Sequence, residues 1–93
     1  MADFATNVSV NENNLATVTI NKGTLPAGTY YFIATVVADG VEYTSTAYEE
    51  TFESDQNFDA SKEGTEYTLT PSIPLDPTVT PTTVTATVIF SYK

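Results

Sequence analysis

Residues 30–48 read YYFIATVVADGVEYTSTAY. Two runs rich in aromatic and β-branched residues, the composition typical of strands, flank the dipeptide Asp39-Gly40. Both residues of a two-residue hairpin turn need a positive φ, which Gly adopts without steric cost. The pattern therefore predicts a β-hairpin with strands at residues 30–38 and 41–48.

The register of this hairpin divides its side chains between two faces. A two-residue turn pairs Ala38 with Val41, and the same register continues to a pair between Phe32 and Ala47. The face opposite to Phe32 then holds four large apolar side chains: Tyr31, Ile33, Val37 and Tyr48. Both faces are thus substantially apolar, and the sequence leaves open which of them is the core. The second face is either covered by a loop or exposed as a protein interface, and we predict an interface because Tyr is enriched at interface cores.

The rest of the chain predicts more strands and no helix. Strands are expected at residues 4–10, 15–20, 67–73 and 84–92, separated by turn clusters at residues 11–14, 21–23, 26–28, 54–57 and 62–64. The last strand alternates most cleanly, with Val84, Ala86, Val88, Phe90 and Tyr92 on one face and Thr83, Thr85, Thr87 and Ser91 on the other. Residues 49–64 are expected to form an acidic connection or a short edge strand near Phe52, and the proline-rich residues 71–81 a stiff crossover. We predict one all-β domain over residues 1–93, an antiparallel β-sandwich of about six or seven strands.

Charge and composition exclude several classes of function. Three Lys and 12 acidic residues give a net charge of −9, and the chain has no Arg, His, Cys or Trp. An acidic surface repels nucleic acid, and no apolar run is long enough to span a bilayer. Without His or Cys there is no Ser/His or Cys/His nucleophile pair, and no nitrogen or sulfur ligand for zinc. We therefore expect no enzyme activity, no cofactor, and neither a nucleic-acid nor a membrane partner.

One segment partly matches a calcium-binding loop. Counted from Asp55, oxygen-bearing side chains fall at positions 1, 3, 5, 7 and 12, the last of them Glu66. Ala60, however, stands where the sharp turn of such a loop needs Gly, and no flanking helices are expected. We predict no metal site here, and leave calcium binding by residues 55–66 as the alternative.

The turn at residues 25–30 reads LPAGTY, in which Gly precedes a strand that carries Tyr. It resembles a recurring motif at the start of a strand in immunoglobulin-like and related prealbumin-like sandwich modules. The resemblance implies an immunoglobulin-like sandwich. In such a turn we expect Tyr30 to be buried and to hold the turn in place.

By fold-level analogy, the chain resembles the small immunoglobulin-like proteins that decorate or cement bacteriophage capsids. The start of the sequence carries neither a basic nor an apolar leader segment, which we interpret as a complete intracellular product or a trimmed one. The analogy implies a virion location and other structural subunits as partners, with the major capsid protein and further copies of this chain as candidates. The alternative is a carbohydrate-binding or adhesion module of a larger cell-surface protein, in which Tyr side chains stack on sugars.

Overall fold

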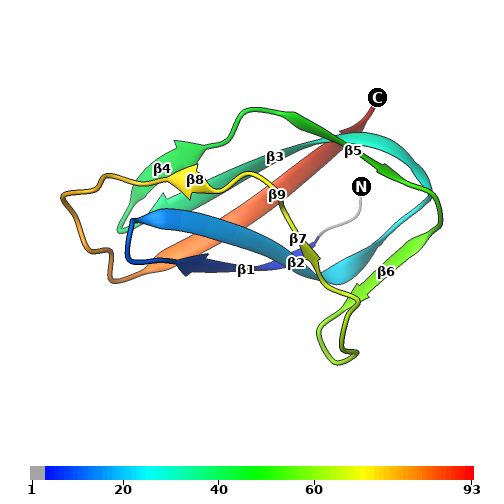
Figure 1. Cartoon of the computed structure of the whole chain (residues 1–93), viewed down its shortest axis with the longest axis horizontal. Coiled ribbons are helices and arrows are strands. Elements are labelled where there is room, and N and C mark those ends of the chain that lie inside the picture. Colours follow the sequence, from blue (N-terminus) through cyan, green and yellow to red (C-terminus); the bar gives the residue numbers. More distant parts are fainter. Residues whose placement is uncertain (1–3) are drawn as a thin grey trace.

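The structure, a computed structural model, describes residues 4–93, and in this range it contains strands and no helix (Figure 1). The strands are β1 (Ala5–Val10), β2 (Leu15–Leu25), β3 (Gly28–Ala38), β4 (Val41–Thr44), β5 (Tyr48–Phe52), β6 (Gln56–Asp59), β7 (Tyr67–Thr68), β8 (Ile73–Pro74) and β9 (Val84–Tyr92).

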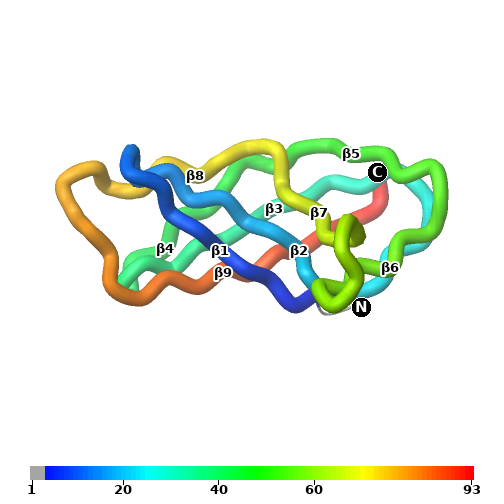
Figure 2. The backbone as a smooth tube through the Cα atoms, turned by 60° about the horizontal axis from the view of Figure 1, so that its bottom comes forward, coloured from blue at the N-terminus to red at the C-terminus, as the bar shows by residue number. Residues whose placement is uncertain are grey.

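The strands form two antiparallel sheets that pack against each other, which confirms the predicted all-β sandwich (Figure 1). In the first sheet β1 pairs with one edge of β2, while the short strands β6, β7 and β8 pair with β2 at successive positions. In the second sheet β9 pairs with β3 along its full length, and β4 and β5 follow one another along the other edge of β3 (Figure 2). Although nine strands are present in residues 4–93, they occupy only six positions across the two sheets.

The core between the sheets has an aromatic half and an aliphatic half. Tyr30, Phe32 and Phe58 are at most 2% exposed, and their rings contact those of Phe52, Tyr67 and Phe90 with centroids 5.5–6.4 Å apart. The other half consists of small and branched side chains: Ala16, Val18, Ala34, Val36, Ala38, Ile73 and Leu75. The core face of the predicted hairpin is therefore the one that carries Phe32.

Two turns adopt the conformations that the sequence predicts. In the hairpin turn, φ is 49° at Asp39 and 84° at Gly40. At the other turn Gly28 has φ of 151°, and the hydroxyl of the fully buried Tyr30 donates a hydrogen bond of 2.6 Å to the carbonyl oxygen of Pro26. The prediction that a buried Tyr30 holds this turn is confirmed.

Other boundaries differ from the predicted ones, and hydrogen bonding explains them. The turn predicted at residues 21–23 is wrong, because β2 continues to Leu25 and pairs there with β6. The strand predicted at residues 67–73 is replaced by β7 and β8, two short strands on either side of Pro71, which has no N–H to offer a ladder. The strand predicted at residues 41–48 stops at Thr44.

Candidate functional site: the outer face of the second sheet

Three of the four residues predicted to form an interface share the side of β3 that faces away from the core. Tyr31 is 37% exposed, and Ile33 and Val37 are half-buried, whereas their neighbours in the chain at Phe32 and Val36 are fully buried. We call this side of the second sheet the outer face, formed by the outward side chains of β3, β4, β5 and β9. Within residues 4–93, the predicted apolar face of the hairpin is thus partly exposed to solvent.

Tyr48 does not share this face, and its predicted placement is wrong. In the register of the turn, Thr35 pairs with Thr44, but Phe32 pairs with Tyr48 instead of Ala47. One extra residue has therefore entered the strand between β4 and β5, as in a β-bulge. Because side chains alternate with a period of two, the extra residue turns Tyr48 inward, where its ring stacks on Phe32 with centroids 5.7 Å apart.

The bulge is held by Ser45 and the buried strand residue Ala34. The backbone N–H of Ser45 donates to the carbonyl oxygen of Ala34 at 2.9 Å. In return, the side-chain oxygen of Ser45 accepts a hydrogen bond of 2.9 Å from the N–H of Ala34. The hydroxyl therefore replaces the backbone acceptor that the ladder loses where β4 ends.

Ile89 is a residue of the outer face that the sequence did not reveal. It lies directly across from Ile33 in the β3 and β9 pairing and is 56% exposed. In the last strand Ile89 falls on the face whose other residues are Thr and Ser. Its partner becomes visible only when the pairing of β9 with β3 is known, because 55 residues separate the two isoleucines in the chain.

The outer face consists of five cross-strand rows. From one end of the sheet to the other they contain Val37 with Glu42 and Thr85, Thr35 with Thr44 and Thr87, Ile33 with Ile89, Tyr31 with Glu49 and Ser91, and Thr29 with Thr51 and Lys93. The two isoleucines form the middle row. Charged groups occur only near the two ends of the face.

One ion pair lies on the outer face. The ammonium nitrogen of Lys93 is 2.8 Å from a carboxylate oxygen of Glu49, and both side chains are about half exposed. This hydrogen bond and the charge of Glu49 raise the pKa of Lys93 above its ordinary value. The carboxylate of Glu42, at the opposite end of the face, has no such cation within residues 4–93.

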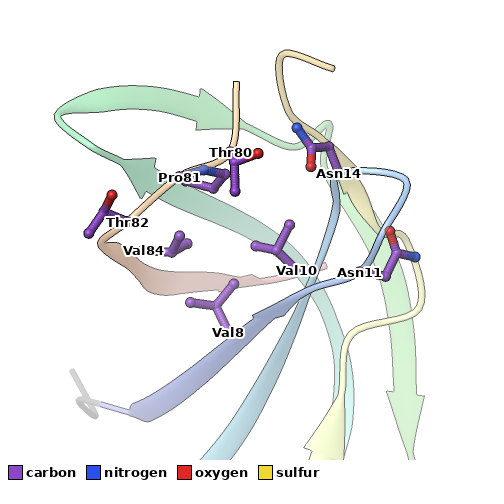
Figure 3. Close-up of a pocket in the computed structure, with 8 residues that line it drawn as sticks. All are labelled: Val8, Val10, Asn11, Asn14, Thr80, Pro81, Thr82 and Val84. Atoms are coloured by element: carbon purple, nitrogen blue, oxygen red, sulfur yellow. The ribbon is translucent and has the colours of Figure 1, made fainter. Parts of the chain in front are cut away.

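A shallow groove of about 310 Å³ lies between the edge strands β1 and β9, at the end where the loops gather (Figure 3). Its apolar floor comes from Val8, Val10 and Val84, and its polar rim from Asn and Thr side chains. The amide nitrogen of Asn14 already donates to the carbonyl oxygens of Asp76 and Val79. The lining contains no titratable side chain, so the groove offers no general acid or base.

The segment predicted as the alternative calcium loop is partly a strand. Residues 56–59 form β6, and Asp59 uses one carboxylate oxygen to accept hydrogen bonds from the N–H and the hydroxyl of Ser61. These hydrogen bonds lower the pKa of Asp59 below its ordinary value. Among residues 4–93 no three acidic side chains are grouped closely enough to hold a metal ion.

No helix in the described part of the chain is long and apolar enough to cross a membrane. Comparison of the chain with protein-family models found no matching family, and comparisons with curated proteins and with solved structures found no match. The outer face is therefore interpreted from its own geometry.

Proposed function

We propose that this chain is a non-enzymatic structural protein that binds other protein subunits through the outer face of its second sheet. The observation that supports this function is the middle row of the face. Ile33 and Ile89 lie side by side on it, flanked by Thr and Tyr, although the chain carries a net charge of −9. An exposed apolar patch with a polar rim is typical of a contact between proteins.

The finer part of the proposal is that the assembly is a virion, in which the chain decorates or cements the capsid. The support is the resemblance of the turn at residues 25–30 to immunoglobulin-like modules, together with the small size of the domain and an inventory of side chains without His, Cys, Arg or Trp. A decoration subunit needs no catalytic group, but it needs one adhesive surface on an otherwise soluble domain. Other structural subunits, the major capsid protein among them, are the proposed partners.

Two measurements test the proposal. Mass spectrometry of purified virus particles should detect the chain as an intact protein of 10.0 kDa. Detection only as part of a longer polypeptide that binds glycans would instead favour an adhesion module.

The second measurement is the occupancy of the particle by variants. Ile33→Glu and Ile89→Lys should be lost from the particle while keeping the far-ultraviolet circular dichroism and melting temperature of the parent. Val79→Lys is a matched control, because Val79 is similarly exposed, at 47%, but lies in the loop before β9. Full occupancy by Ile89→Lys would show that the outer face is not the contact.

A further inference from the structure

One edge of the second sheet ends in a long strand without a partner. β9 pairs with β3 on one side, and within residues 4–93 no strand pairs with its other side (Figure 1). The sequence of β9, VTATVIFSY, contains no charged residue and no Pro. A strand edge of this kind presents a row of backbone N–H and C=O groups to which a further strand can bind.

The ladder between β9 and β3 shows which backbone groups of β9 point outward. At its two ends the N–H of Asp39 donates to the carbonyl oxygen of Thr83, and the N–H of Lys93 to that of Thr29. In an antiparallel ladder the residues that bond to one neighbour alternate with residues whose backbone groups point to the other side. The odd-numbered residues of β9 therefore bond to β3. The outward groups belong to the even-numbered residues Val84, Ala86, Val88, Phe90 and Tyr92.

β1 crosses this edge but does not pair with it (Figure 2). The hydroxyl of Thr6 donates a hydrogen bond of 2.6 Å to the carbonyl oxygen of Ala86, in agreement with the outward direction of that carbonyl. β1 belongs to the first sheet and hence to the other layer. Because a carbonyl oxygen can accept two hydrogen bonds, Ala86 can still pair with a strand added in the plane of the second sheet.

The other edges of the two sheets carry features that oppose such pairing. Charged side chains, Pro and bulges are the ordinary protections of an edge strand. β5 contains Glu49 and Glu50, β8 contains Pro74, and the register of β1 shifts between Ala5 and Thr6. β9 has none of these protections over its nine residues. Its edge is therefore the one suited to binding another strand.

A second copy of β9 matches this edge along its full length. Only an extended backbone with a free edge of its own can meet the alternating donors and acceptors. When two copies of β9 lie antiparallel about a two-fold axis at Val88, the outward groups of each face those of the other. All nine residues then pair: Val84 with Tyr92, Thr85 with Ser91, Ala86 with Phe90, Thr87 with Ile89, and Val88 with Val88 of the second copy.

The side chains brought together in this register are compatible. Toward the core, Val84 meets Tyr92 and Ala86 meets Phe90, so a small or branched side chain lies beside an aromatic one. On the outer face Thr85 meets the hydroxyl of Ser91. Pairs of both kinds stabilise neighbouring strands. No two charges face each other, although each copy carries a net charge of −9.

The burial of β9 also leaves room for a neighbour. Its inward side chains at Val84, Ala86, Val88 and Phe90 are only half-buried, whereas the inward residues of β3 with which these four pair are buried. A strand beside β9 would cover the remaining exposed area of these side chains. Burial of apolar surface would thus add to the hydrogen bonds of the new ladder.

We infer that β9 pairs with β9 of a second copy of this chain, antiparallel and with Val88 opposite Val88, so that the second sheets of the two copies form one continuous sheet. This contact goes beyond the proposed function, because it uses a strand edge and not the outer face. A two-fold axis perpendicular to the sheet places both outer faces on the same side. Ile89 of one copy then lies opposite Thr87 of the other, and the two middle rows become neighbours.

The first test measures the self-association of the purified chain. Analytical ultracentrifugation over a concentration series that reaches the millimolar range should show a reversible equilibrium between monomer and dimer. Val88→Pro should remain a monomer throughout, because it removes an N–H that points away from β3 and so breaks the new ladder without breaking the one with β3. A parent chain that is monomeric at every concentration would overturn the inference.

Thr51→Pro is the matched control for this substitution. By the same alternation its N–H also points away from β3, but it lies in β5, on the opposite edge of the sheet. It should dimerise like the parent. Circular dichroism and melting temperature check that both proline variants keep the fold.

The second test uses disulfide cross-linking and does not depend on a proline variant. The chain has no Cys, so each introduced thiol is unique. In the inferred register Thr85 and Ser91 of different copies form a pair without backbone hydrogen bonds, with Cα atoms about 4.5 Å apart, which a disulfide can span. Mild oxidation of a mixture of Thr85→Cys and Ser91→Cys should therefore give a covalent dimer on a non-reducing gel.

Each cysteine variant alone is the control for the mixture. Two copies of Thr85→Cys, or of Ser91→Cys, hold their thiols about 20 Å apart along the strand direction, too far for a disulfide. Each variant oxidised alone should remain largely monomeric. A mixture that cross-links no better than its separate components would overturn the register.

The failure of this inference and that of the proposed function are distinguishable. A monomeric parent, together with loss of Ile89→Lys from the particle, would overturn the β9 contact and support docking through the outer face. A parent that dimerises and cross-links in the expected register, together with full occupancy by Ile89→Lys, would support the β9 contact and overturn docking through the outer face.

Discussion

The phenol of Tyr67 donates a hydrogen bond of 2.8 Å to a carboxylate oxygen of Glu50, and so links β7 of the first sheet to β5 of the second. The hydroxyl of Tyr48 lies 3.2 Å from that of Tyr67 and extends the link. Both tyrosine rings belong to the aromatic half of the core. The three side chains therefore hold the sheets together along the margin opposite to β1 and β9.

Tyr67→Phe should lower the free energy of unfolding by about 1.5 kcal/mol, the lower end of the net contribution of a hydrogen bond to a charged group. Urea denaturation followed by circular dichroism measures the change. Tyr31→Phe is the control, because the Tyr31 hydroxyl has no hydrogen-bond partner within residues 4–93, and it should change the stability by less than about 0.5 kcal/mol. Equal effects of the two substitutions would mean that the link contributes nothing.

The same link predicts a loss of stability in alkali. Burial raises the pKa of Tyr67, and its hydrogen bonds with Tyr48 and Glu50 raise it further; burial also raises the pKa of Tyr48. Below about pH 10 both the folded and the unfolded chain keep these protons. Above about pH 10 the unfolded chain releases them while the folded chain retains them, so the free energy of unfolding falls as the pH rises. Melting temperatures between about pH 8 and about pH 11 should fall less steeply in Tyr48→Phe/Tyr67→Phe than in the parent.

A second substitution tests the bulge. Ser45→Ala removes the acceptor of the Ala34 N–H, and Ala34 is only 1% exposed. A buried N–H without a partner costs about 1–3 kcal/mol, so the free energy of unfolding should fall by that amount. Ser45→Thr retains the hydroxyl and should keep most of the stability, while Thr46→Ala, at an exposed position, should change little. Parent-like denaturation of Ser45→Ala would contradict this account of the bulge.

The hairpin turn predicts a response to acid. The two carboxylate oxygens of Asp39 accept hydrogen bonds of 2.8 and 2.9 Å from the N–H groups of Thr83 and Thr82, which lowers the pKa of Asp39. Because the pKa of Asp39 is lower in the folded state than the ordinary aspartate value of about 3.9, its carboxylate stabilises the fold at pH values above about 3.9. This stabilisation is lost as the pH falls below that value.

Asp39→Asn should therefore melt at a lower temperature than the parent at neutral pH, because its amide nitrogen cannot accept a hydrogen bond. Between about pH 7 and about pH 3 its melting temperature should change less than that of the parent. Glu12→Gln, whose side chain makes no hydrogen bond within the described residues, should follow the parent curve. A parent-like slope in Asp39→Asn would contradict the role of this carboxylate.

Local signals were sufficient to predict the sandwich and the apolar β3 residues of the candidate site. The Asp39-Gly40 turn determines the register near it, and this register places Tyr31, Ile33 and Val37 on one side of β3. Which side faced the core depended on packing between the sheets, because both sides of the hairpin are apolar. That choice is made by packing against Phe58 and the residues of β2, which belong to the other sheet.

The bulge was harder to predict, because Thr44, Ser45 and Thr46 are compatible with either register. What determines the register is the burial of Tyr48 and Phe52, which alternate with polar residues at Glu49 and Thr51. This second alternation was present in the sequence. Its phase relative to the hairpin, however, is offset by one residue, and the packing of Tyr48 against Phe32 and of Phe52 against Tyr30 reveals that offset.

The pairing of β9 with β3 has a consequence for the order in which the chain can fold. Residues 39–83 separate the two strands, so one edge of β3 lacks its partner until this whole stretch has been synthesised. Pairing between strands so far apart in sequence makes folding slow, because the loop must close before any contact forms. During this interval β3 exposes an uncharged edge rich in Val, Ile and aromatic side chains, which makes the nascent chain most prone to aggregate just before its last strand emerges.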